Sequence, residues 1–326
     1  MASTRAPAAA LREGLVVASH GRHVWVETPQ GERWMCHARG KKSQTVVGDQ
    51  VLWMPSQDEG TVEQVLERRN LLYRQDEIRT KSFAANLDLV LILIAAEPEF
   101  SESQLTRALI AAAAQDIAVL IVLNKSDLQP HFSRAWERLA PYRAMGYTVL
   151  ATALRPKSYP DDAPTNSPAD GWPELLGALA HKTSLVLGPS GAGKSTLINR
   201  LVPGAQALTQ EISSALNSGK HTTTSTTHYW TDAAHTTALI DSPGFQEFGL
   251  QHIDPMRLAS LMPDLCAWVD QCKFYNCSHL HEPGCGVMAR LAPRDSGDAG
   301  DNSSTISPHR YRIYQELFAE LSQQRY

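Results

Sequence analysis

The sequence predicts a multidomain protein with an all-β barrel first, a central α/β domain next and a mostly α-helical domain last. Three observations lead to this fold class. Residues 12–80 contain about five short strand patterns separated by turn residues. Continuous apolar runs that alternate with helical patterns follow, which is typical of a parallel sheet covered on both faces. From residue 247 onward the pattern is helical and rich in cysteine and histidine.

Composition and charge restrict the kind of protein this chain can be. Hydrophobic residues make up 43% and charged residues 20% of its 326 residues, as in globular proteins. The net charge of -4 excludes a global basic field, so any RNA contact needs a local patch. No apolar run has the length of a membrane span, and the N-terminus lacks the apolar segment of a signal peptide. We therefore expect a cytoplasmic monomer without a membrane partner, in which residues 1–11 are a disordered tail.

The first domain, residues 12–80, is expected to form a small barrel with strands at 14–18, 24–27, 33–37, 50–54 and 61–66. This set fits an OB-fold, and an SH3-like barrel fits nearly as well. Residues 11–45 carry six Lys or Arg against three Glu, which suits RNA binding. The alternative is a solvated loop beside core tryptophans. The residues concerned are Arg33, Arg39, Lys41, Lys42, Trp25, Trp34 and Trp53.

The central domain, residues 81–246, alternates strands and helices. Strands are expected at 87–94, 118–123, 147–151, 184–187 and 237–240, and helices at 103–114, 133–145, 173–180 and 196–201. The third domain, residues 247–326, ends in an amphipathic helix at 311–323. Residues 155–171 and 296–307 are rich in turn-forming and polar residues, so we expect surface loops there.

A phosphate-binding loop is the strongest motif. Residues 188–195 match G-x-x-x-x-G-K-[ST] between an apolar strand and a helical pattern. Its backbone N–H groups would surround phosphate oxygens, Lys194 would reach the β- and γ-phosphates, and Ser195 would bind Mg²⁺. The expected nucleotide contacts are Gly188, Pro189, Ser190, Gly191, Ala192, Gly193, Lys194, Ser195 and Thr196.

A second motif selects the base. Asn124, Lys125 and Asp127 form N-K-x-D directly after a buried strand. The Asp127 carboxylate can accept hydrogen bonds from N1–H and the exocyclic amine of guanine, a donor pair that adenine lacks. Asn124 would hold the loop, and the stem of Lys125 would cover one face of the base. The predicted ligand is therefore GTP or GDP.

Two further motifs would sense the γ-phosphate. Asp241 and Gly244 form D-x-x-G after a strand; Asp241 would act on Mg²⁺ through a water, and the Gly244 amide would contact the γ-phosphate. The threonines at 222–224 lie between the two phosphate motifs, and Thr223 is the favoured Mg²⁺ ligand among them. Phe245 follows D-x-x-G where many GTPases have a water-orienting Gln, so slow intrinsic hydrolysis is expected. His221 is the local candidate for catalysis; the alternative is an ordinary loop histidine.

The order of these motifs is unusual, because N-K-x-D precedes the phosphate loop instead of following D-x-x-G. A permuted chain can still build the same site, since a sheet is assembled by spatial adjacency. The D-x-x-G switch then leads directly into the third domain, so loss of the γ-phosphate could move that domain.

The third domain carries a metal motif, in which Cys272, Cys277, His279 and Cys285 lie within 14 residues. Three thiolates and one imidazole suit a closed, structural Zn²⁺ site. His281 is an alternative ligand, and the alternative to a metal site is a set of buried thiols beside a histidine. The remaining cysteines, Cys36 and Cys266, are expected to be ordinary buried thiols. An odd number of cysteines, five, without an export signal argues against a disulfide framework.

Together these motifs resemble the circularly permuted, small-subunit-dependent GTPases of the RsgA/YjeQ family, over roughly residues 12–326. The resemblance implies an N-terminal OB-fold, a permuted GTPase domain and a C-terminal zinc domain. It also implies late maturation of the small ribosomal subunit, contact with its rRNA, and GTP hydrolysis stimulated by that subunit. His221 matches the family's catalytic histidine. Thr152 and Ala153 stand where the family has a guanine-supporting S-A-x loop, from which this sequence departs.

Two other functions compete with this hypothesis. The chain could be a nucleic-acid-binding module that uses GTP as a structural ligand, which Phe245 favours. Ribosome-responsive turnover that vanishes in His221→Ala would reject that hypothesis. The chain could instead be a P-loop kinase or ATPase, against which Asn124 and Asp127 argue; a preference for ATP would support it.

Overall fold

The computed structural model describes residues 11–20, 23–39, 45–56, 59–76, 80–154, 171–205, 226–242, 248–291 and 305–323. Its N-terminal strands close into a barrel with the order β1-β2-β3-β5-β4 and a further pairing of β4 with β1. The strands β3 and β5 are parallel. This closed five-stranded topology is that of an OB-fold, so the SH3-like alternative is wrong. The strands are β1 (Arg12–His20), β2 (His23–Glu27), β3 (Arg33–Ala38), β4 (Gln50–Met54) and β5 (Gly60–Val65).

The central sheet is parallel in the order β10-β9-β8-β11-β13, with β12 antiparallel at its edge. Every residue of β8 is buried, because its two faces serve two cores. Its residues 90, 92 and 94 belong to the core shared with α1, α2 and α3, and residues 89, 91 and 93 to the core shared with α4 and α5. This explains the continuous apolar run. The strands are β8 (Leu89–Ala95), β9 (Ala118–Asn124), β10 (Thr148–Thr152), β11 (Thr183–Leu187), β12 (Thr226–Trp230) and β13 (Ala238–Asp241).

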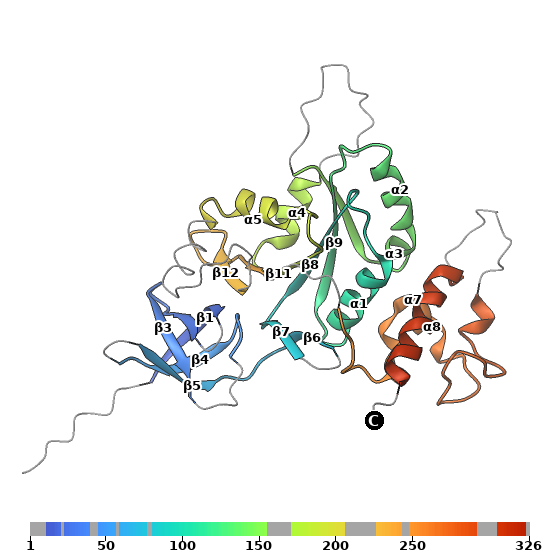
Figure 1. The fold of residues 1–326 in the computed structure, drawn as a ribbon, viewed down its shortest axis with the longest axis horizontal. Helices are drawn as coiled ribbons and strands as arrows, with labels where there is room; N and C mark the ends of the chain where they lie inside the picture. Colours follow the sequence, from blue (N-terminus) through green and yellow to red (C-terminus); the bar gives the residue numbers. More distant parts are fainter. Residues whose placement is uncertain are drawn as a thin grey trace, which may run out of the picture.

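Helices cover both faces of this sheet (Figure 1). The single helix predicted over residues 133–145 is wrong, because the structure has two helices there. Pro141 lies in the first turn of the second helix, where its missing N–H is tolerated, whereas it would disrupt the middle of one long helix. The helices are α1 (Glu102–Ala113), α2 (His131–Arg138), α3 (Ala140–Ala144), α4 (Trp172–Leu179) and α5 (Lys194–Leu201).

The barrel and the central sheet are joined edge to edge. Strand β12, which the sequence analysis missed, pairs with β1 so that Ala18 lies opposite Thr227. The indole N–H of Trp230 donates to Glu27 over 2.7 Å, and Arg33 donates to the same carboxylate over 2.8 Å. The barrel is therefore attached to the strand that separates the threonine loop from D-x-x-G.

A hairpin, also missed, lies between the barrel and the central sheet; its strands are β6 (Leu71–Gln75) and β7 (Thr80–Ala85). Phe83 stacks on Phe248 with ring centroids 5.5 Å apart, and Gln75 forms a β-bridge with Leu250. The hairpin thus contacts the start of the C-terminal region.

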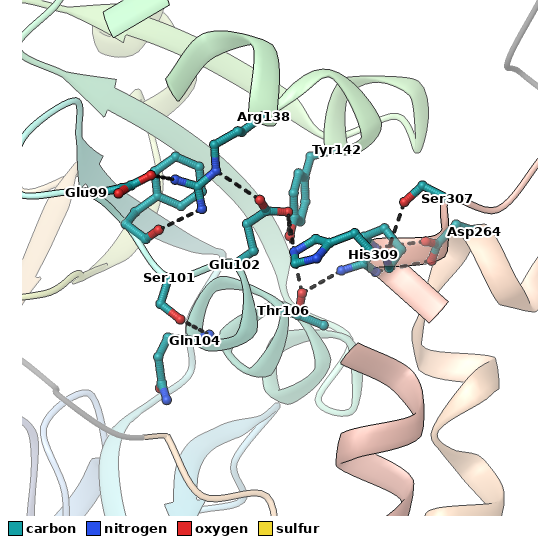
Figure 2. Close-up of polar contacts among 12 residues, drawn as sticks. Glu99, Ser101, Glu102, Gln104, Thr106, Arg138, Tyr142, Asp264, Ser307 and His309 are labelled. Carbon is teal, nitrogen blue, oxygen red and sulfur yellow. Dashed lines mark hydrogen bonds and ion pairs between the residues drawn. The ribbon is translucent and has the colours of Figure 1, made fainter. Parts of the chain in front are cut away.

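The named elements of the C-terminal region are all helices, in agreement with the predicted α class, and the region lies on the side of α1, away from the barrel (Figure 1). A buried polar network joins α8 to the central domain (Figure 2). Arg310, which is 2% exposed, donates to Asp264 over 2.9 Å and to the hydroxyl of Thr106. No described helix is long and apolar enough to span a membrane. The elements are η1 (Pro255–Arg257), η2 (Ala259–Leu261), α7 (Pro263–Val269), η3 (Met288–Arg290) and α8 (Pro308–Ser322).

Candidate nucleotide-binding site and metal centre

The predicted phosphate loop joins the end of β11 to the start of α5, at the carboxyl edge of the sheet. Two of its glycines have left-handed backbones, with φ of +80° at Gly191 and +110° at Gly193. A Cβ on Gly188 would lie 2.1 Å from the carbonyl oxygen of Leu93, and one on Gly193 would lie 2.4 Å from the side-chain nitrogen of Asn124. These positions therefore require glycine, and the loop is held tightly between two neighbouring strands.

Lys194 begins α5 and folds back over the loop. Its ammonium donates to the carbonyls of Gly188 over 2.7 Å and Pro189 over 3.0 Å. Burial lowers the pKa of Lys194, and the charge of Asp241 opposes that shift. Ser195 is exposed in the same helical turn. The donors of a loop and a helix N-terminus thus surround one place suited to anionic oxygens.

Asp241 ends β13 beside this loop and lies opposite Val186 of β11. Burial raises its pKa to about 6, although the charge of Lys194 opposes the rise. The hydroxyl of the next residue, Ser242, donates to the carbonyl of Val186 over 3.0 Å. Asp241 is therefore a partly buried carboxylate near a lysine. This arrangement would favour a cation between the carboxylate and the phosphates of a bound nucleotide.

One buried amide connects three loops of the candidate site. Asn124, 3% exposed, donates to the carbonyl of Ala192 in the phosphate loop over 2.9 Å. Its side-chain oxygen accepts from the backbone N–H of Leu154 over 3.1 Å. Because both halves of the amide are satisfied, Asn124 fixes the N-K-x-D loop against the phosphate loop and the loop after β10.

The other base-selecting candidates lie around this amide. Lys125 has a left-handed backbone with φ of +63°, and its ammonium donates to the carbonyl of Glu97. The backbone N–H of Ser126 donates to Thr152 over 3.0 Å, so the turn that carries Asp127 lies against Thr152 and Ala153. The hydroxyl of Thr152 is buried without a hydrogen-bond partner among the described residues. A polar ligand edge at this place could satisfy it.

Several predicted residues lie outside the described residues: His221, Thr223, Gly244 and Phe245, and the basic Lys41 and Lys42 of the barrel. The loops expected at 155–171 and 296–307 fall largely there too. The site that the structure assembles therefore consists of the phosphate loop, Asp241, the N-K-x-D loop and the loop after β10.

The predicted metal ligands come together. One ligand atom from each of Cys272, Cys277, His279 and Cys285 lies within 4.8 Å of all the others. The Nδ1 atom of His279 is 3.4 Å from the sulfur of Cys272 and 3.5 Å from that of Cys285. Three sulfurs and one imidazole nitrogen at this spacing fit a tetrahedral Zn²⁺ site. His281, the alternative ligand, is exposed and outside the cluster.

The loop around this cluster has an organiser that the sequence analysis missed. The carboxylate of Glu282 accepts from the backbone N–H and hydroxyl of Ser278, over 2.8 and 2.6 Å, and from the N–H of Leu280 over 3.2 Å. Burial raises the pKa of Cys277 to about 12, so its thiol stays protonated at neutral pH until a cation displaces the proton. No spacing rule marks Glu282, because its partners are mainly backbone groups.

The two cysteines outside the cluster differ in exposure. Cys266, expected to be buried, is exposed on α7, whereas Cys36 is buried in the barrel as expected.

Trp53 is fully buried in the barrel core, which agrees with the alternative of core tryptophans. Arg33 pairs with Glu27, and Arg39 pairs with Glu63. The described basic side chains of the barrel are thus partly neutralised.

The fold and site define a P-loop GTPase domain with its motifs in circularly permuted order, between an OB-fold barrel and a helical Cys/His domain. The RsgA GTPase family profile matches residues 65–251. The chain belongs to the RsgA GTPase family, and is thus a GTP hydrolase.

Relatives cover nearly the whole chain. One named "Small ribosomal subunit biogenesis GTPase RsgA", of Variovorax paradoxus (strain S110), is 66% identical over 97% of this chain and 94% of its own length. A protein of the same name from Burkholderia pseudomallei (strain 1710b) is 48% identical over 95% of this chain and 93% of its own length.

Solved structures show the same architecture. The crystal structure of YjeQ from Thermotoga maritima is 28% identical, with a TM-score of 0.69, and the match covers 97% of this chain and 100% of that one. YloQ, a circularly permuted GTPase, is similar in fold with a TM-score of 0.66 at 23% identity, over 99% of this chain and 100% of that one.

Proposed function

We propose that this GTPase binds the small ribosomal subunit and hydrolyses GTP to GDP and phosphate during late maturation of that subunit. We further propose that it acts in the cytoplasm as a monomer and that the subunit stimulates its hydrolysis. The contact of Asn124 with Ala192 and Leu154 carries the GTPase part, because it joins the base-selecting and phosphate loops into one site. The printed names of the relatives support the ribosomal part.

Each contact in the nucleotide site has a proposed role. The Asp127 carboxylate accepts hydrogen bonds from the guanine donors, and the stem of Lys125 covers one face of the base. Thr152 and Ala153 contact the edge of the base. Lys194 moves from its loop carbonyls to the β- and γ-phosphates when GTP binds, which replaces two neutral acceptors by charged ones. The phosphate contacts are Gly188, Pro189, Ser190, Gly191, Ala192, Gly193, Lys194, Ser195, Thr196 and, at the γ-phosphate, Gly244.

Metal ions complete both sites in this proposal. Ser195 and Thr223 would be direct ligands of Mg²⁺, and Asp241 would act on it through a water. The position of Asp241 at the end of β13, beside the phosphate loop and Lys194, supports this role, and a bound cation would offset the effect of burial on its pKa. The four-residue cluster would hold one structural Zn²⁺, for which its donor set is suited.

We propose three domains: a barrel at residues 12–80, the GTPase domain at 81–246 and the zinc domain at 247–326, after a tail at 1–11. The catalytic residue in this proposal is His221, because Phe245 cannot orient water. The rRNA of the small subunit would be a direct partner, through patches on the outer two domains.

Steady-state GTP hydrolysis with and without purified small subunits tests this function. We expect a large stimulation by the small subunit, little by the large subunit, and its loss in His221→Ala with GTP affinity retained. A rate that small subunits leave unchanged would contradict the ribosomal assignment. Stimulation that survives in His221→Ala would contradict the assigned catalytic residue alone.

A further inference from the structure

The metal loop displays two adjacent aromatic side chains to solvent. Tyr275 is 103% exposed and Phe274 is 40% exposed, although both follow directly after the cluster residue Cys272 and Lys273. The described residues include three other large apolar side chains that are similarly exposed, but those are scattered over the molecule. A neighbouring aromatic pair on one loop is therefore unusual for this surface, and among the described residues none covers the ring of Tyr275.

Hydrogen bonds hold the loop on either side of this pair. The N–H of Lys273 donates to the carbonyl of Gly284 over 3.0 Å, which closes the loop. On its far side, the hydroxyl of Tyr311 donates to His279 over 2.6 Å and that of Tyr314 to Ser278 over 2.7 Å. A rigid base lowers the entropy cost of using an exposed ring in binding.

The charge next to the pair is positive. The ammonium of Lys273 lies 5.5 Å from the ring centre of Phe274. Its stem packs on Gly284, where an added Cβ would lie 3.1 Å from that of Lys273. Lys273 directly precedes the pair, whereas the exposed Asp270 lies four residues before Phe274, and the nearby Glu282 is engaged by the N–H groups of its own loop. Aromatic faces beside one cation suit a base and its phosphate.

We propose that Tyr275 and Phe274 form a stacking platform for an unpaired RNA base, with Lys273 at the adjacent phosphate. The inference rests on the proposed function, since the small subunit supplies single-stranded loops and bulges of rRNA. A flat ring that is exposed on both faces fits a splayed base, and the adjoining cation attracts RNA in an otherwise acidic chain. The tryptophan in the barrel core, Trp53, is buried and cannot serve in this way.

The test measures binding of the full-length chain to a fluorescent single-stranded oligouridine and, separately, to purified small subunits. Tyr275→Ala is expected to weaken both affinities about tenfold, because stacking contributes at this level per base. Tyr275→Phe keeps the ring and should stay within about twofold of wild type. Met256→Ala is the matched control, since Met256 is 46% exposed but lies away from the metal loop and should change neither affinity.

Ultraviolet cross-linking to small subunits identifies the partner directly. A nucleotide adduct on the peptide with Phe274 and Tyr275 supports the inference, and an adduct with a ribosomal protein overturns it. Unchanged affinities in Tyr275→Ala, for the oligouridine and the subunit, also overturn it, while stimulated GTP hydrolysis by the same variant would leave the proposed function intact. Oligouridine binding that Tyr275→Ala weakens, together with GTP hydrolysis that small subunits leave unchanged, would support the platform and reject the proposed function.

Discussion

The nucleotide site and the metal cluster are assembled in opposite ways. The nucleotide site gathers loops from β9, β10, β11 and β13, whose positions are set by a large apolar sheet. The candidate metal cluster draws its four donor residues from residues 272–285, in a loop with little regular structure. The first site is thus built by the fold, whereas the second must help to build its own surroundings.

This difference predicts how each site responds when its ligand or a key residue is removed. The GTP-free nucleotide site should keep its shape. Its folded state then pays the free-energy cost of burying the charged groups of Asp241 and Lys194 without phosphate or a cation beside them. The metal cluster without its ion should lose local structure. Three thiols form only weak interactions with one another, whereas three thiolates would bind a cation strongly.

Replacing a cluster thiol should give the largest effect. Cys285→Ser should lose bound zinc and destabilise residues 263–291 by about 4 kcal/mol or more, because loss of a structural metal is among the most costly single changes. Metal analysis and amide hydrogen exchange measure both results. Cys266→Ser is the control, since this exposed thiol lies outside the cluster. GDP affinity should stay within about twofold. Full zinc content in Cys285→Ser would contradict the assigned ligands.

Removing Asp264 from the network of Figure 2 tests how Arg310, which also donates to Thr106 of the central domain, is held in place. Asp264→Ala leaves the guanidinium of Arg310 buried without its charge partner and should cost about 3–5 kcal/mol of stability. Chemical unfolding measures the loss. Arg39→Ala, which removes an ion pair whose arginine is 72% exposed, should cost at most about 1 kcal/mol. Equal effects of the two variants would show that Arg310 is stabilised without Asp264.

A change in the carboxylate proposed to select the base should affect binding and leave the fold intact. Asp127→Asn replaces one of the two carboxylate oxygens by an amide donor, so one guanine donor loses its acceptor; GTP binding should weaken about a hundredfold or more, while binding of xanthosine triphosphate improves. Competition against a fluorescent guanine nucleotide measures both. Asp116→Asn is the control, because Asp116 is exposed at the opposite edge of the sheet and its φ of +58° tolerates Asn. A similar loss in the control would point to a general effect on folding.

The smallest effect concerns the buried switch carboxylate in the nucleotide-free chain. Since burial raises the pKa of Asp241 to about 6, above its unfolded value of 3.8, its ionisation destabilises the fold progressively as the pH rises from about 4, and the cost is complete above pH 6. Asp241→Asn should therefore raise the free energy of unfolding by about 1–2 kcal/mol at pH 8, and the gain should vanish as the pH falls toward 4. Denaturant titrations across this pH range measure it. A gain that persists at pH 4 would show that charge is not its cause.

Local motifs predicted the residues that the structure brings together at the candidate nucleotide site and in the Cys/His cluster, whereas contacts between distant segments could not be predicted from local patterns. The β8 run and the phosphate loop follow from patterns within a few residues. Strand β12 is short and polar in part, and its partner β1 lies about two hundred residues earlier, so no local pattern marks it. Arg310 looks like a surface residue of an amphipathic helix until Asp264 and Thr106 are placed around it.

Competition of unlabelled GTP and ATP for a bound fluorescent guanine nucleotide tests the central claim that the permuted chain builds one guanine-specific site. Because Asn124 joins the phosphate loop to the N-K-x-D loop, the base and the phosphates should be bound together. We predict displacement by GTP at a concentration at least about a hundredfold below that of ATP, since adenine lacks the donor pair for Asp127. Equal displacement by the two nucleotides would contradict the account.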